Sequence, residues 1–162
     1  MNLITKCLSA TALLCLPLML LADARTTTFQ DWVSVCRTVQ GVERCHISQN
    51  LYLENEQGSN RLLQATVGKL DGGNVLQLIL PLGVDLRPGI VFKIDEEEEF
   101  AAPYITCMQE GCVVAIGLDQ TLWRTLRGGA VAKIGFRPFN TEQTVVLEMS
   151  LLGFTRASNT IK

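Results

Sequence analysis

The residues of this chain best suited to chemistry are its six cysteines, its one histidine and a run of consecutive acids. Four cysteines form two close pairs, Cys36 with Cys45 and Cys107 with Cys112, and each pair brackets a short polar stretch typical of a hairpin turn. Such cysteines can form structural disulfides, bind zinc or take part in redox exchange. Zinc ligands usually lie about two to four residues apart, and neither pair is a C-x-x-C redox motif. We therefore expect two structural disulfides, one within each pair, in preference to the zinc and redox alternatives.

The spacing within each pair suits a disulfide beside a two-residue hairpin turn. If Gln40-Gly41 is the first turn, Cys36 lies opposite Cys45 at a non-hydrogen-bonded position, where Cα atoms are about 4.5 Å apart. A disulfide can span that distance. A turn centred on Gln109-Glu110 places the second pair in the same way. The first turn also sets Arg37 against a second arginine, which is mildly destabilising, so a slightly longer loop is an alternative that keeps the bridge.

The single histidine and the acidic run are weak candidates for a catalytic or metal site. His46 would have to serve any Ser-His-Asp or Cys-His mechanism, but on an alternating strand it points away from the core face and toward solvent. The run from Asp95 to Glu99 could offer oxygens to calcium, yet consecutive residues converge poorly, so a solvated loop is favoured. Paired carboxylates for glycoside hydrolysis stay open, because any two acids could meet in space. We predict no catalytic residue, no bound metal and no cofactor.

The N-terminus has the organisation of an export signal. Residues 1–6 carry one lysine, residues 7–21 are almost entirely apolar, and small residues precede a predicted cleavage between Ala24 and Arg25. A membrane-spanning helix needs about 20 apolar residues, and Pro17 interrupts this shorter run. A retained anchor is one alternative. A lipoprotein built on Cys15 is another, although leucines precede that cysteine where small residues are expected.

Cleavage after residue 24 of the 162 leaves a predicted single domain of residues 25–162, with no transmembrane span. The net charge of the whole chain is −2, and no cluster of lysine or arginine gives an electrostatic reason to bind nucleic acid. Disulfides and an export signal favour the periplasm, with outer-membrane association and secretion left open. The oligomeric state does not follow from the sequence.

Apolar and polar residues alternate with period two through most of the chain, as is typical of strands. Turn signals such as Asp71-Gly72-Gly73 and Arg87-Pro88-Gly89 divide these segments. The predicted strands include residues 63–67, 75–80, 90–94, 130–136 and 145–151. One short helix is predicted near residues 119–127, capped by Asp119, with Trp123 in the core. The pattern predicts an all-β sandwich or barrel of short antiparallel strands with this one helix, and a core that buries Trp32, Leu80, Leu147 and Phe154.

Several motifs, taken in order, resemble the invasion associated locus B family of exported bacterial proteins. They are Trp32 before Cys36, Gln49 behind Cys45, Leu80-Pro81-Leu82-Gly83-Val84-Asp85-Leu86, Pro88-Gly89, Ile94-Asp95, Pro103-Tyr104, Gly111-Cys112, Gly128-Gly129 and Ser150-Leu151-Leu152-Gly153-Phe154. Locally, the prolines and glycines are typical of turns, and the last motif is interpreted as the end of the final core strand. The resemblance implies an immunoglobulin-like β-sandwich in the envelope of a Gram-negative bacterium. It also implies a link to host-cell entry and supplies no catalytic residues.

The sequence therefore predicts a protein that is not an enzyme and that binds a protein partner, either a host factor or an envelope component. Two alternatives are kept. One is a structural envelope protein whose effect on invasion is indirect, and the other is a cryptic hydrolase. A concave site with convergent polar groups and displaced pKa values would favour the enzyme, whereas an exposed apolar surface would favour the binder.

Overall fold

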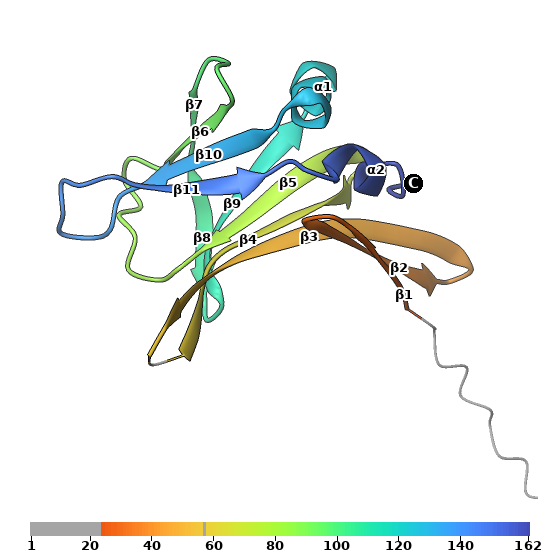
Figure 1. The fold of residues 1–162 in the computed structure, drawn as a ribbon, viewed down its shortest axis with the longest axis horizontal. Helices are drawn as coiled ribbons and strands as arrows, with labels where there is room; N and C mark the ends of the chain where they lie inside the picture. The colour runs from red at the N-terminus through yellow and green to blue at the C-terminus, as the bar shows by residue number, and fades with distance from the viewer. Residues whose placement is uncertain (1–23, 57) are drawn as a thin grey trace, which may run out of the picture.

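The computed structural model describes residues 24–56 and 58–162. The predicted signal peptide, residues 1–24, lies outside these residues except for Ala24, so the cleavage site stays a prediction. The described chain folds into two antiparallel sheets that face each other, with two helices at one end (Figure 1). None of the helices in residues 24–56 and 58–162 is long and apolar enough to cross a membrane.

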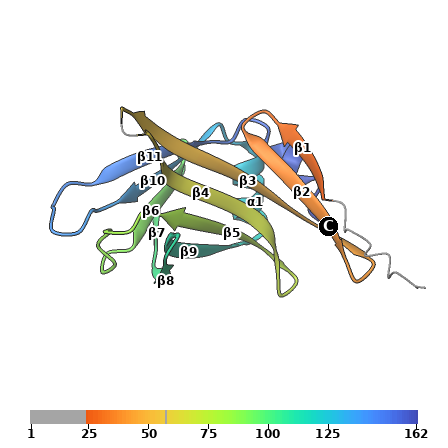
Figure 2. The ribbon, with the colours of Figure 1, turned by 90° about the horizontal axis from the view of Figure 1, so that it is seen from below.

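The larger sheet has seven strands in the order β1-β2-β3-β4-β5-β9-β8. Its strands are β1 (Arg25–Phe29), β2 (Trp32–Val39), β3 (Val42–Asn55), β4 (Gly58–Leu70), β5 (Gly73–Leu80), β8 (Tyr104–Met108) and β9 (Gly111–Leu118). The view in Figure 2 shows this sheet in front, with α1 and the smaller sheet behind it. Strands β2, β4 and β5 follow the alternating pattern of the sequence, because each presents every second side chain to the interior over much of its length.

The smaller sheet has four strands in the order β11-β10-β6-β7. Its strands are β6 (Ile90–Ile94), β7 (Phe100–Ala102), β10 (Val131–Phe136) and β11 (Val145–Ser150). The helices are α1 (Gln120–Gly128), which follows β9, and α2 (Phe154–Ser158), which follows β11. The fold is the all-β sandwich that the sequence predicts.

The core lies between the two sheets and is almost wholly apolar. Trp32, Leu80, Leu147 and Phe154 are all buried, as predicted. The rings of Trp32 and Phe154 meet edge to face with centroids 5.0 Å apart, a favoured aromatic geometry. Trp123 of α1 is half-buried and packs against the core, as expected, with its ring centroid 5.8 Å from that of Phe154.

The first hairpin has the predicted register. Val39 pairs with Val42 around a two-residue turn, and both turn residues, Gln40 and Gly41, have positive φ, as a type I′ turn requires. Arg37 therefore lies directly opposite Arg44, and the longer loop considered above does not form. Both arginines are exposed on the outer face, where water screens their repulsion.

Each hairpin carries a disulfide. Cys36 pairs with Cys45 across β2 and β3, with Cα atoms 4.0 Å apart and both residues buried. Cys107 pairs with Cys112 across β8 and β9, with Cα atoms 3.9 Å apart. In this second bridge Cys112 is buried and Cys107 is exposed, because β8 is an edge strand.

Three features differ from the sequence prediction. The strands are not all short, since β3 has 14 residues and β4 has 13. The last strand ends at Ser150, and the motif that follows is a turn leading into a second helix, so the prediction of one helix was wrong. Gly153, the N-cap residue of α2, has φ +89°, and an added Cβ would collide with the carbonyl oxygen of Phe29.

The predicted helix α1 forms where expected. Asp119 is its N-cap, and the side chain accepts a hydrogen bond from the backbone N–H of Leu122 at 2.8 Å. Gly128 is the last helical residue, and Leu126 is buried against the core. The loop between β6 and β7 lies next to this helix, at the top of Figure 1.

Candidate binding groove

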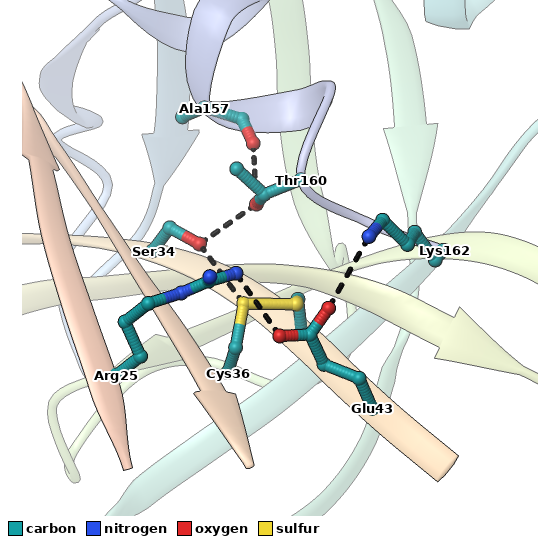
Figure 3. Close-up of a disulfide and its surroundings, with 8 residues drawn as sticks. Arg25, Ser34, Cys36, Glu43, Ala157, Thr160 and Lys162 are labelled. Carbon is teal, nitrogen blue, oxygen red and sulfur yellow. Dashed lines mark hydrogen bonds and ion pairs between the residues drawn. A yellow bond between two sulfur atoms is a disulfide. The ribbon is translucent and has the colours of Figure 1, made fainter. Parts of the chain in front are cut away.

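The first disulfide lies under the C-terminal segment (Figure 3). Glu43, next to the bridge, forms ion pairs with Arg25 at 3.0 Å and with Lys162 at 3.2 Å. In residues 24–56 and 58–162, one set of three possible metal ligands lies close together, namely Cys36, Cys45 and Glu43. The two sulfurs are joined to each other, so this set lacks the thiolates that a zinc site needs.

His46 lies on the outer face of β3, opposite Val35 of β2, and it is exposed as predicted. The preceding and following residues, Cys45 and Ile47, face the core. Within the described part of the chain, no carboxylate or hydroxyl hydrogen-bonds to the imidazole ring of His46. A mechanism through this histidine therefore has no neighbouring partner in place.

The motif residues Gln49 and Ser150 hold the two sheets together. The buried Gln49 amide donates to the carbonyls of Asp31 and Ser150, each at 3.1 Å, and accepts from the Ser150 N–H at 3.1 Å. The Trp32 indole N–H donates to the same Ser150 carbonyl at 2.9 Å. The Ser150 hydroxyl hydrogen-bonds to the Asp31 carboxylate at 2.6 Å. These motif residues therefore have a structural role.

Another motif residue, Asp85, forms an ion cluster at the end of the sandwich away from the two helices. Its carboxylate is 3% exposed and lies 2.8 Å from the Arg87 guanidinium and 2.6 Å from that of Arg137. Hydrogen bonds from Arg87 lower the pKa of Asp85 most; burial opposes them, and Arg137 lowers the pKa further. Burial, and then the charge of Asp85, raises the pKa of Tyr104 to about 12. This cluster stabilises the loop that follows β5.

The acidic run divides into residues with different roles. Asp95 is not a solvated acid, because its carboxylate accepts hydrogen bonds from the backbone N–H groups of Ala130 at 2.9 Å and Val131 at 3.0 Å. These two bonds, the first more than the second, lower the pKa of Asp95. Glu96 follows the prediction of a solvated loop, since its side chain is 97% exposed. Its carboxylate lies 3.8 Å from the ammonium group of Lys93.

Two further acids of the run, Glu97 and Glu98, line a groove between the β6–β7 loop and α1. The volume of the groove is about 380 Å³, and its walls come from β6, β7, β9, α1 and the loop. The residues that line it are Ile94, Glu97, Glu98, Phe100, Ile116, Gly117, Asp119, Thr121, Leu122 and Thr125. Ile94 and Ile116 are buried and form an apolar floor. We call this hollow the acidic groove.

The acidic groove combines apolar surface with one sign of charge. Its three ionisable lining residues, Glu97, Glu98 and Asp119, are all acids. Phe100 forms one wall and is 36% exposed, with its ring packed on buried Phe92 at 5.5 Å. The lining offers no histidine, cysteine or lysine to act as a base or nucleophile. Such a surface is suited to holding a ligand by shape and charge.

Sequence reasoning identified the acidic run but not its neighbours. The hydrophobic residues of the groove lie on four separate elements: Ile94 on β6, Phe100 on β7, Ile116 on β9 and Leu122 on α1. The one signal in the sequence was the position of the acids directly after the predicted strand of residues 90–94. Which elements meet there depends on the packing of the smaller sheet against β9, which residue spacing does not encode.

The fold and the groove define a β-sandwich with a disulfide in each of two hairpins and an acidic groove at one end. The chain belongs to the invasion associated locus B (IalB) protein family, whose family model matches residues 32–162. Two curated relatives are the invasion protein B homologues of Brucella abortus strain 2308 and of Brucella abortus biovar 1 strain 9-941. Each is 28% identical over 142 residues, which cover 87% of this chain and 81% of the relative.

A solved structure has the same fold. The crystal structure of invasion associated protein B from Bartonella henselae aligns with a TM-score of 0.72 and 24% sequence identity. The alignment covers 84% of this chain and 93% of that protein. The family resemblance identified from the ordered motifs is therefore confirmed.

Proposed function

We propose that the mature chain is a non-enzymatic binding protein of the periplasm of a Gram-negative bacterium and acts by engaging another protein. The observation that carries this proposal is the acidic groove, which offers an apolar floor and a charged rim but no histidine, cysteine or lysine. Two disulfides support an oxidising compartment. Membership of the invasion associated locus B family supports a role in invasion.

The displaced pKa values also support binding in preference to catalysis. Catalytic groups usually have perturbed pKa values and lie together in a cleft. Here Asp85 is held by two arginines and Asp95 by two backbone donors, which are structural arrangements. Tyr104 does not line the groove. Each perturbed group thus has a structural cause that involves no reacting ligand.

The test combines capture with enzyme assays. The mature protein, tagged and cross-linked in the envelope of its own bacterium, should yield a discrete adduct with another protein. The purified protein should have no hydrolytic, glycosidic or redox turnover that depends on His46, Glu97 or Glu98. An enzyme would instead be established if turnover fell tenfold or more in His46→Ala or in Glu97→Gln/Glu98→Gln. A tenfold loss corresponds to about 1.4 kcal/mol of transition-state stabilisation. Absence of any adduct, with an envelope-permeability defect in the deletion strain, would favour the structural alternative.

A further inference from the structure

We propose that the acidic groove receives a basic peptide segment of the protein partner. A lysine or arginine of that segment faces Glu97 and Glu98, and a neighbouring apolar side chain lies on the floor formed by Ile94 and Ile116, next to Leu122. This inference rests on the proposed protein-binding function and adds the chemistry of the partner.

The charges of Glu97 and Glu98 are uncompensated, whereas the Asp119 carboxylate caps α1. Glu97 and Glu98 have no lysine, arginine or histidine within ion-pair distance anywhere in residues 24–56 and 58–162. By contrast, Glu96 lies next to Lys93. A cation that enters the groove therefore meets carboxylates that have no other counter-ion from the protein, while an acidic segment is repelled.

The loop that carries these acids is anchored at its base. The N–H of Asp95 donates to the Val131 carbonyl at 3.0 Å, and its carboxylate binds two backbone N–H groups at the start of β10. The N–H of Glu97 donates to the carbonyl of Ile94 at 2.9 Å, which closes the turn. A loop fixed in this way loses little conformational entropy when a partner binds.

The apolar floor distinguishes a peptide from a smaller cation. Calcium needs about six to eight oxygen ligands, and Ile94, Ile116 and Leu122 supply none from their side chains. A small polyamine could satisfy the charges but would leave the floor and the Phe100 wall uncovered. A basic segment that also carries leucine or valine satisfies both parts, because it buries apolar area while placing its charges at the rim.

A matched control exists in the same loop. Glu99 lines a different hollow, on the outer face of the smaller sheet, together with Lys93 and Lys133. The Glu96→Gln/Glu99→Gln variant therefore removes as much charge as Glu97→Gln/Glu98→Gln but leaves the acidic groove unchanged. On α1, Thr121 lines the groove and its neighbour Gln120 does not.

The experiment measures binding of a capped synthetic peptide of Arg-Leu-Lys-Val repeats to the mature protein by calorimetry at about 0.15 M ionic strength. We expect Glu97→Gln/Glu98→Gln to weaken binding about tenfold or more, and Glu96→Gln/Glu99→Gln to weaken it less than about threefold. Thr121→Arg, which places a cation inside the groove, should abolish binding, whereas Gln120→Arg should not. Melting curves of all variants check that each is folded.

Two further probes give outcomes that separate the explanations. A peptide in which serine replaces leucine and valine should bind about tenfold more weakly, and spermine should not compete at equal charge concentration. The proposal would be overturned in favour of unspecific charge attraction by either of two results. One is an equal loss of peptide affinity in both glutamate double variants, and the other is binding of the serine peptide and of spermine as tight as that of the original peptide. If the peptide does not bind but the envelope adduct persists in Thr121→Arg, the basic-segment inference fails while the binding function stands.

Discussion

The replacement of Gln49 by leucine should weaken the fold, because one buried amide links three backbone groups. It contacts the carbonyls of Asp31 and Ser150 and the N–H of Ser150, each at 3.1 Å. Gln49→Leu keeps a similar side-chain size but removes all three hydrogen bonds. The Ser150 carbonyl keeps the hydrogen bond from the Trp32 indole. The Asp31 carbonyl and the Ser150 N–H, by contrast, lose their hydrogen bonds to Gln49.

The magnitude follows from those two unpartnered groups. Each buried unsatisfied group costs about 1–3 kcal/mol. Burying the leucine side chain offsets about 1–2 kcal/mol. At the midpoints of these ranges, the net loss in the free energy of unfolding should be about 2.5 kcal/mol, which for a domain of this size lowers the melting temperature by roughly 5–10 °C.

Thermal and urea unfolding, followed by circular dichroism, measure this loss. Gln64→Leu is the matched control, because Gln64 lies on the opposite face of the same sheet and should change stability by less than about 0.5 kcal/mol. Combining Gln49→Leu with Trp32→Phe should reveal a coupling of at least about 0.5 kcal/mol through Ser150. A Gln49→Leu variant that melts within about 2 °C of wild type would refute this role for the amide.

Three other predictions concern the bridges, the core and the ion cluster. Non-reducing peptide mapping of the protein isolated from its own bacterium should find Cys36 linked to Cys45 and Cys107 linked to Cys112; a crossed pairing would contradict the two-hairpin arrangement, and the chain-entropy model assigns the bridges about 2.7 and 2.2 kcal/mol. Leu147→Ala should lower the unfolding free energy by about 2–5 kcal/mol, and an unchanged melt would show that this strand face is not core. The lowered pKa of Asp85 means that its cluster stabilises the fold above the ordinary value of 3.8 and loses that contribution as the pH falls below it. The difference in melting temperature between wild type and Asp85→Asn should therefore shrink between pH 5 and pH 2, and a constant difference would contradict the assignment.

Local features of this protein could be predicted from its sequence. The register of the first hairpin followed from two turn residues and the spacing of its cysteines, and the cap of α1 followed from Asp119. These features depend on neighbouring residues. The second helix was missed because the apolar residues around Leu151 continue a strand pattern, and the positive φ of Gly153 is not evident from its residue type alone.

Long-range contacts explain what the sequence did not predict. Gln49 and Ser150 are 101 residues apart, so their hydrogen bonds could not be inferred from spacing. The same holds for Asp95, which the sequence placed in a solvated run although its carboxylate binds the start of β10. The acidic groove also depends on long-range contacts, because it exists only where the loop after β6 meets α1.

The most direct test of the binding function is site-specific photo-cross-linking in living bacteria. A photoreactive residue at Thr121 should give a discrete adduct with a second protein, and the adduct should disappear in the Glu97→Gln/Glu98→Gln background. The control places the photoreactive residue at position 46 in place of His46, on the outer face of the larger sheet. An adduct that forms equally at His46, or one at Thr121 that survives the loss of both carboxylates, would contradict binding through the acidic groove.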